Sequence, residues 1–373
     1  MKKILLCFGT RPEAIKMASL VHTLQDNKNL EVKVCVTAQH REMLDQVLDF
    51  FEITPDFDLD IMQPNQTLNS VSAKILSGMD TIFDTFEPDL ILVHGDTTTS
   101  TLCALAAFHK GIKIGHVEAG LRTFDKKSPF PEEMNRVLTA QLSNFHFAPT
   151  AKSSKNLLQE NIMQDNVVTT GNTVIDSLFW AEKKLAAGYK NETICQLEKM
   201  LDPSKKIILV TAHRRENFGQ SIINICDAII EIAARDNVEF FFPAHPNPNI
   251  KNIVSEKLSN ISNVHLIEPL DYPAFIWLMK KSHIILTDSG GVQEEAPSFG
   301  IPVLVMRDNT ERPEAVDAGT VKLIGTEKNS ILSNVAELLD DNVKYELMSR
   351  SHNPYGDGLA NQRIMKYIEE HGE

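Results

Sequence analysis

The sequence predicts an α/β protein made of two Rossmann-like, doubly wound domains that face each other across a cleft. The chain has 373 residues, too many for one ordinary core and suited to two domains of about 150–200 residues. Short apolar runs alternate with longer amphipathic segments, as strands alternate with helices in such folds. This pattern runs through the first half and starts again after a break near residues 171–205.

The short apolar runs are the expected strands. Several are apolar at every position, as parallel strands covered on both faces must be. In the first half they lie at residues 3–8, 32–37, 89–95, 112–118, 144–149 and 167–171, and in the second half at 206–212, 239–244, 264–268, 283–288, 302–306 and 321–325. The segments between them have helical spacing. After Pro12, for example, apolar residues recur at every third position from Ile15 to Leu24.

Composition and charge exclude several classes of function. The formal net charge of −13 argues against sequence-independent binding to nucleic acid, which requires a basic face. No apolar stretch reaches the roughly 18–20 residues of a membrane-spanning helix, and the apolar run at the N-terminus is too short for a signal peptide. The five cysteines form no C-x-x-C pair, so we expect reduced, buried thiols in a cytoplasmic protein.

The first expected strand is followed by "FGTRPEAIK". Its glycine allows a tight turn, and Arg11 and Lys16 put cations near a helix start. Taken alone, this segment is explained equally well as a surface loop. The dinucleotide fingerprint G-x-G-x-x-G is absent, so we expect no cofactor of that kind.

Three carboxylates are expected at the carboxyl ends of strands, where ligands bind in open α/β sheets. Asp96 precedes a threonine, so an ordinary helix N-cap competes with a role as acid or base. Glu118 is followed by a glycine turn rather than a helix, which favours function over capping. Glu132 lies behind Pro131, where catalysis and stabilisation of the helix dipole explain it equally well. Arg136 lies one turn further on.

The second domain offers cations and a glycine turn. His213 begins "HRR" at the end of that domain's first strand, where an anion would be met. In "TDSGGVQEEA", Ser289, Gly290 and Gly291 precede a helix, whose N-terminus attracts anions. Arg312 follows a later strand. We therefore expect a phosphate-bearing group on the second domain, with chemistry at the carboxylates of the first.

No metal site is expected. The segment "DFDLD", residues 56–60, has the D-x-D spacing of some metal sites, but a solvated extended segment is the preferred interpretation. There is no H-E-x-x-H motif and no Cys/His cluster, so zinc is not indicated. His245 lies among prolines after another strand, where a rigid loop is the default interpretation.

In this order, the motifs closely resemble those of the bacterial non-hydrolysing UDP-N-acetylglucosamine 2-epimerases. The likeness runs from end to end, through "GTRPEAIKMA", "HGDTTT", "GHVEAGLRT", "PEEMNR", "GNTVID", "AHRREN", "TDSGGVQEEAPS", "RDNTERPEA" and "NPYGDG". The resemblance implies a GT-B-like fold whose C-terminal helix packs back on the first domain. The expected domains are residues 1–170 with 355–373, and residues 171–354.

The resemblance implies reversible conversion of UDP-N-acetylglucosamine (UDP-GlcNAc) to UDP-N-acetylmannosamine (UDP-ManNAc), which would supply ManNAc units for bacterial surface polysaccharide. UDP would leave C1 to give 2-acetamidoglucal and then add back, with C2 protonated on the other face. Inversion requires two titratable groups in different environments. Asp96, Glu118 and Glu132 match the family's essential acids, and His213 is assigned to the same set. Which acid is the base stays open.

The resemblance also assigns the nucleotide. The family's Ser-Gly-Gly turn receives the diphosphate, and its second acid, here Glu295, accepts hydrogen bonds from both ribose hydroxyls. Glu294 receives no role. The residues that match substrate-binding positions are Arg11, Lys16, Arg136, His213, Ser289, Gly290, Gly291, Glu295 and Arg312.

Some family members bind a second UDP-GlcNAc as an activator, and the family suggests a homodimer. Glu42 and Asn65 differ from the Gln and Arg of the members in which the activator site is best defined, so activation stays open. The residues that fit the allosteric pattern are Gln39, His40, Gln66, Glu132 and His245.

Three rival functions remain. A GT-B glycosyltransferase would share the fold and the nucleotide site but needs an acceptor pocket and usually one base. A hydrolysing epimerase would release free ManNAc. A non-catalytic UDP-sugar sensor would not need Asp96, Glu118 and Glu132 together. Three acids after consecutive strands favour epimerisation.

Overall fold

The computed structural model describes residues 1–38, 41–63, 66–214, 217–244 and 247–371. The chain forms two compact units, Met1–Trp180 with Tyr355–Glu373, and Ala181–Pro354. The first unit extends past residue 170, the end predicted from sequence, into helix α7 (Thr173–Ala186). Trp180 belongs to it because its ring stacks on His22, with centroids 5.4 Å apart.

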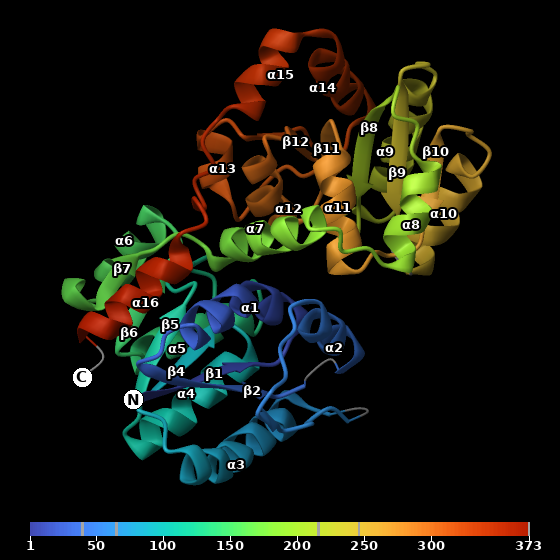
Figure 1. Ribbon diagram of the computed structural model, residues 1–373. Coiled ribbons are helices and arrows are strands. Elements are labelled where there is room, and N and C mark those ends of the chain that lie inside the picture. The colour runs from blue at the N-terminus through green and yellow to red at the C-terminus, as the bar shows by residue number, and fades with distance from the viewer. Residues whose placement is uncertain (39–40, 64–65, 215–216, 245–246, 372–373) are drawn as a thin grey trace. The chain divides into compact units, whose positions relative to one another are not determined.

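The first unit is a seven-stranded sheet in the order β3-β2-β1-β4-β5-β6-β7, parallel throughout (Figure 1). The order runs outward from the β1/β4 pair in both directions, which makes this pair the switch point where ligands bind in such sheets. The strands are β1 Lys2–Phe8, β2 Leu30–Val36, β3 Phe57–Asp58, β4 Leu90–His94, β5 Lys113–Val117, β6 Phe145–Ala148 and β7 Val167–Thr169. The helices are α1 Arg11–Gln25, α2 Arg41–Phe50, α3 Leu68–Phe86, α4 Thr98–Lys110, α5 Glu132–Leu142, α6 Ala151–Gln159 and α16 Ala360–His371.

The second unit repeats this architecture with a six-stranded parallel sheet in the order β10-β9-β8-β11-β12-β13. Its switch point lies between β8 and β11. The strands are β8 Lys206–Thr211, β9 Val238–Pro243, β10 Val264–Ile267, β11 Ile284–Thr287, β12 Val303–Val305 and β13 Val321–Leu323. The helices are α8 Glu192–Met200, α9 Gln220–Ala233, α10 Pro248–Leu258, α11 Tyr272–Lys281, α12 Gly290–Glu295, α13 Pro313–Asp317, α14 Lys328–Asp340 and α15 Asn342–Ser349.

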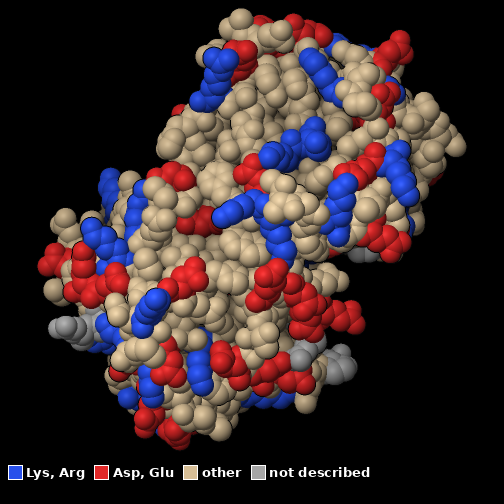
Figure 2. Space-filling view, in the orientation of Figure 1, with Lys and Arg blue, Asp and Glu red and all other residues tan. Residues whose placement is uncertain are grey.

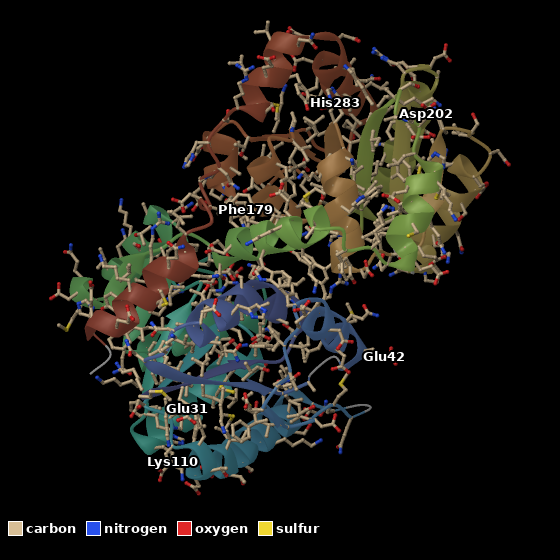
Figure 3. All side chains as sticks on the ribbon, in the orientation of Figure 1. Glu31, Glu42, Lys110, Phe179, Asp202 and His283 are labelled. Carbon is tan, nitrogen blue, oxygen red and sulfur yellow. The ribbon has the colours of Figure 1, made fainter. Side chains whose placement is uncertain are left out.

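Helix α16 at the C-terminus packs on the first unit, as the family resemblance implies. Its first N–H groups, those of Ala360 and Asn361, donate to the buried Asp176 carboxylate at 3.2 and 3.0 Å. Burial raises the pKa of Asp176 to about 6, although these hydrogen bonds act in the opposite direction. In the turn before α16, Gly358 has φ +80°, and a Cβ atom there would lie 2.4 Å from the ring of Phe179 (Figure 3). Only glycine allows this close approach.

Each predicted strand is present, so the α/β prediction is confirmed at the level of its elements. Strand β3 was not predicted as a strand, and it falls in the segment 56–60 that was expected to be extended. The five cysteines are free thiols, and all but Cys195 are buried. Acidic and basic side chains are interspersed on the visible face of each unit (Figure 2). Among the described residues, no helix has both the length and the apolar character that crossing a membrane requires.

Candidate active site

The turn from β1 into α1 fixes the positions of Arg11 and Lys16. At Gly9 a Cβ atom would lie 1.9 Å from Thr37 Oγ1, so only glycine lets the chain pass this side chain. Glu13 accepts hydrogen bonds from the backbone N–H groups of the turn at 3.0 and 2.8 Å. Arg11 is therefore the first residue of a well-anchored helix, and Lys16 lies on its second turn.

Glu118 follows β5 and is contacted from three other segments of the first unit. Lys16 Nζ lies 2.5 Å from its Oε1 atom, and Asn172 Nδ2 donates to the same oxygen at 3.2 Å. His94 Nε2 lies 3.0 Å from Oε2. The backbone of Glu118 has φ +59°, a conformation that non-glycine residues seldom adopt and that is common at functional positions. The sequence indicated Lys16 and Glu118 but missed His94 and Asn172.

Asp96 is not the N-cap of α4, so the competing structural interpretation of this residue is wrong. The cap is Thr97, whose hydroxyl accepts a hydrogen bond from the Ser100 N–H at 3.0 Å within a capping box. The Asp96 carboxylate instead accepts a hydrogen bond from Arg136 Nη2. Asn135 Nδ2 donates to the Asp96 backbone carbonyl at 2.9 Å. The first turns of α5 therefore hold both the side chain and the backbone of Asp96.

The two glutamates at the start of α5 have different surroundings. Glu132 is half-buried, and the described residues include no hydrogen-bond or ion-pair partner for its carboxylate. Glu133 is only 2% exposed, and its carboxylate accepts hydrogen bonds from the N–H groups of Thr123 and Phe124 at 3.0 and 2.9 Å. Periodicity could not separate two adjacent acids, and the sequence analysis gave no individual role to Glu133.

In the second unit, a buried aspartate organises the end of β8. Asp288 Oδ2 accepts hydrogen bonds from the N–H groups of His213 and Arg214, both at 2.8 Å, and from Asn217 Nδ2 at 2.9 Å. His213 Nδ1 lies 2.9 Å from Asp288 Oδ1. Burial alone would raise the pKa of Asp288, but the contacts with His213 and Arg214 lower it. Asp288 thus orients His213, whose side chain is 45% exposed.

The glycine turn forms the start of helix α12, as predicted. Ser289 occupies the N-cap position without a side-chain capping bond, and Gly290 and Gly291 are the first helical residues. The first N–H groups of the helix are therefore available to an anion. Glu295, at the end of the same helix, is 7% exposed, and one of its oxygens accepts a hydrogen bond from the Tyr272 hydroxyl at 3.1 Å.

Glu294, which received no role from the sequence, holds Arg312. Its carboxylate is 1% exposed and accepts a hydrogen bond from Arg312 Nε. A second carboxylate, that of Glu311, accepts hydrogen bonds from two arginines. Arg307 Nη1 donates to it at 2.8 Å and Arg214 Nη1 at 3.1 Å. Burial would raise the pKa of Glu311, but the two arginines lower it to about 2. Carboxylates thus fix the arginines around the glycine turn before any ligand binds.

Most of the predicted allosteric residues lie outside the described part of the chain. These are Gln39, His40 and His245. Asn65, which differs from the family's activator pattern, also lies outside the described residues. Gln66 is described, and its Nε2 atom contacts Met62 Sδ at 3.5 Å. Glu42 is exposed on α2 (Figure 3). The described residues contain no group of three or more His, Cys, Asp or Glu side chains that could hold a metal ion.

Comparison with known proteins gives one consistent family. The family model described as UDP-N-acetylglucosamine 2-epimerase matches residues 22–369. The UDP-N-acetylglucosamine 2-epimerase of Salmonella typhimurium is 54% identical over 371 residues, which cover 99% of each chain. The enzyme of that name from Escherichia coli K12 is 54% identical over 368 residues, or 98% of each chain.

Solved structures agree with this family and with the two-domain fold. The crystal structure of UDP-GlcNAc 2-epimerase from Neisseria meningitidis bound to UDP-GlcNAc superimposes with a TM-score of 0.90 at 51% identity, and the match covers 99% of this chain and 100% of that one. The UDP-GlcNAc 2-epimerase from Methanocaldococcus jannaschii, solved with UDP-GlcNAc and UDP, gives a TM-score of 0.79 at 33% identity, over 99% of this chain and 100% of that one. These matches confirm the predicted fold class. The chain belongs to the UDP-N-acetylglucosamine 2-epimerase family.

Proposed function

We propose that this protein interconverts UDP-GlcNAc and UDP-ManNAc by eliminating UDP to 2-acetamidoglucal and adding it back. Family membership supports the substrate, because the Neisseria meningitidis relative was solved with UDP-GlcNAc bound. The observation that carries the proposal is the arrangement of acids in the first unit. Glu118 and Asp96 are paired with Lys16 and Arg136, while Glu132 stands apart at the start of α5.

In the elimination, the C2–H bond breaks and its electrons form the C1=C2 double bond. The C1–O bond breaks at the same time, and its electron pair leaves with the diphosphate. We assign the C2 proton to one of the two carboxylates that contact cations, Asp96 or Glu118. Re-addition to the other epimer requires a proton donor on the opposite face, and a second carboxylic acid in different surroundings fits that role. Glu132 has such surroundings.

The second unit supplies the nucleotide site in this proposal. The start of α12 at Ser289, Gly290 and Gly291 offers N–H groups to the diphosphate. Arg312 and His213 lie near it on their carboxylate supports and would stabilise the negative charge that grows on the leaving group. Glu295 lies near the far end of the short helix, where its carboxylate would accept hydrogen bonds from the ribose hydroxyls.

The cellular setting is part of the same proposal. UDP-ManNAc would serve as a source of ManNAc units for bacterial surface polysaccharide. We expect a cytoplasmic homodimer that needs no added cofactor, with UDP-GlcNAc as an activator if the residues around Gln66 form a second sugar-nucleotide site.

The test is to mix the protein with UDP-GlcNAc and no cofactor and to identify the products by proton NMR. We expect UDP-ManNAc to accumulate to a constant ratio with UDP-GlcNAc. Free ManNAc would identify a hydrolysing enzyme. Transfer of GlcNAc to an added acceptor with its configuration at C2 unchanged would identify a glycosyltransferase. Binding without any turnover would identify a sensor.

A further inference from the structure

Glu133 is a buried acid inside a region rich in polar groups. It lies next to Glu132 at the start of α5, but it is 2% exposed and its carboxylate points into the protein. A buried carboxylate is costly unless hydrogen bonds and cations compensate its charge. The partners that compensate Glu133 connect it to the residues that we assign to the chemistry.

The first partner is the segment that joins Glu118 to Glu132. Both Glu133 oxygens lie 3.0 Å from the Thr123 N–H nitrogen, and Oε1 accepts from Phe124 N–H at 2.9 Å. Phe124 has φ +63°, an unfavourable backbone for a non-glycine residue. Its side chain is 72% exposed, so packing of the ring does not hold this conformation. The hydrogen bonds to Glu133 help to hold it, together with the Thr123 hydroxyl, which donates to the Ser128 carbonyl at 2.6 Å.

The second partner is Arg136. Its Nη1 atom lies 3.4 Å from Glu133 Oε2, and its Nη2 atom donates to the Asp96 carboxylate. Arg136 Nε is buried and makes no hydrogen bond within the described chain. The position of the guanidinium therefore depends on the two carboxylates at its far end. If Glu133 is neutralised, Arg136 keeps Asp96 but loses the contact that fixes its direction.

We propose that Glu133 is a positioning residue for epimerisation. It fixes Arg136, and through it Asp96, and it also fixes the segment between Glu118 and Glu132. One buried carboxylate thereby sets the geometry of all three proposed catalytic acids without touching the substrate itself. This inference rests on the proposed function.

Glu133→Gln is the informative variant because it keeps the size of the side chain. An amide has one acceptor oxygen, and its NH2 group would face N–H donors. We expect kcat to fall about 10- to 100-fold, the loss typical of misplaced catalytic groups. The KM for UDP-GlcNAc and the affinity for UDP should stay within about threefold, because the nucleotide site is on the second unit.

Glu160→Gln is the matched control. Glu160 accepts two hydrogen bonds at 2.7 Å from Arg122, which lies in the same segment, but the described contacts of Glu160 include neither Arg136 nor Asp96. The Glu160→Gln variant should lower the melting temperature, as Glu133→Gln does, but its kcat should stay within about twofold of the wild-type value. Glu133→Asp keeps the buried charge and both acceptors on a shorter side chain, so we expect an intermediate kcat. If Glu133→Gln does not fold, the Glu133→Asp variant is used in its place.

All variants are assayed beside the wild type for UDP-ManNAc formation, UDP binding and thermal unfolding. A positioning role is supported if kcat falls in Glu133→Gln while KM and UDP affinity stay unchanged and Glu160→Gln turns over normally. If Glu133→Gln does not fold, the same result in Glu133→Asp supports it. A wild-type kcat in the Glu133 variants would overturn the positioning role of Glu133 but not the proposed function. A fall of kcat in Glu160→Gln as large as that in Glu133→Gln would do the same. A wild-type protein that forms no UDP-ManNAc would overturn the proposed function and this inference together.

Discussion

The ammonium group of Lys16 lies 2.5 Å from Glu118 Oε1, which joins the second turn of α1 to the residue that follows β5. The family resemblance places Lys16 around the nucleotide and Glu118 among the catalytic acids. The structure of the first unit puts the two in direct contact. Lys16 therefore contacts the Glu118 carboxylate directly, and the neighbours of this carboxylate also include the amide of Asn172 and the imidazole of His94.

Lys16→Met keeps the apolar stem of the side chain and removes the charge. A hydrogen bond to a charged group contributes about 1.5–3 kcal/mol, so we expect kcat/KM to fall roughly 10- to 100-fold. UDP affinity should fall less, because Glu118 is the partner of this cation. The measurement compares steady-state kinetics with UDP titration by calorimetry. If the loss appears in UDP affinity alone, Lys16 is a diphosphate ligand and its contact with Glu118 is incidental.

Asp96→Asn should slow turnover strongly without destabilising the protein. Thr97 caps α4, and the Asp96 side chain is 29% exposed, so we expect loss of its ion pair with Arg136 to cost about 1 kcal/mol. An amide cannot exchange a proton as a carboxylate does, so kcat should fall by a factor of about 10²–10⁴. UDP affinity should not change, because we propose that the nucleotide binds on the second unit.

Thr97→Ala is the control for this variant. Loss of the cap should lower the free energy of unfolding by about 0.5–2 kcal/mol while leaving far more activity than Asp96→Asn. Turnover of Asp96→Asn near the wild-type rate would move the catalytic assignment to Glu118 and Glu132.

Glu295→Ala tests the ribose assignment. Loss of a charged acceptor should weaken UDP binding roughly 10- to 100-fold. Tyr272→Phe removes only the hydroxyl that donates to Glu295 Oε1 and should have a smaller effect. Calorimetric titration with UDP distinguishes the two variants. Unchanged affinity in Glu295→Ala contradicts the assignment.

Asp176 predicts a pH dependence of stability. Burial raises its folded-state pKa from 3.8 to about 6, so its contribution to stability is fully present below about pH 4 and is lost as the pH rises through about 6. A pKa difference of about two units between the folded and unfolded states corresponds to about 3 kcal/mol of unfolding free energy. Asp176→Asn does not titrate, so it should gain up to about that much unfolding free energy relative to wild type between pH 4 and pH 7.

The measurement is urea unfolding followed by the fluorescence of Trp180, with Trp277→Phe as the background of both proteins. Trp180 then reports on the unit that contains Asp176. A difference between the two proteins that does not change with pH would show that Asp176 is ionised as freely in the folded state as in the unfolded one.

The sequence predicted the strands and the glycine turn because both depend on local chemistry. Short, continuous apolar runs are typical of parallel strands that are covered on both faces, and Gly290 and Gly291 begin a helix after one of them. The assignment of Asp96 as a competing cap failed because a cap is set by where the backbone enters the helix. That point is one residue later, at Thr97, where Ser100 completes the capping box.

Other residues could not be identified from local pattern. Glu132 and Glu133 are adjacent, as are Glu294 and Glu295, and a local sequence pattern cannot tell which partners each acid of a pair contacts. Tertiary contacts decide this. Arg312 donates a hydrogen bond to Glu294, and the N–H groups of Thr123 and Phe124 donate to Glu133. Asn172 and Glu118 meet only through folding, since 54 residues separate them in the chain.

In the function proposed above, C2 is inverted through elimination and re-addition, with protein carboxylates exchanging its proton. The most direct measurement is proton NMR of UDP-GlcNAc with the wild-type protein in D2O, without any added cofactor. We expect UDP-ManNAc that carries deuterium at C2, and deuterium incorporation that falls in parallel with turnover in Asp96→Asn. UDP-ManNAc that retains the original hydrogen at C2 would contradict it, because that result requires transfer of the hydrogen without exchange with solvent.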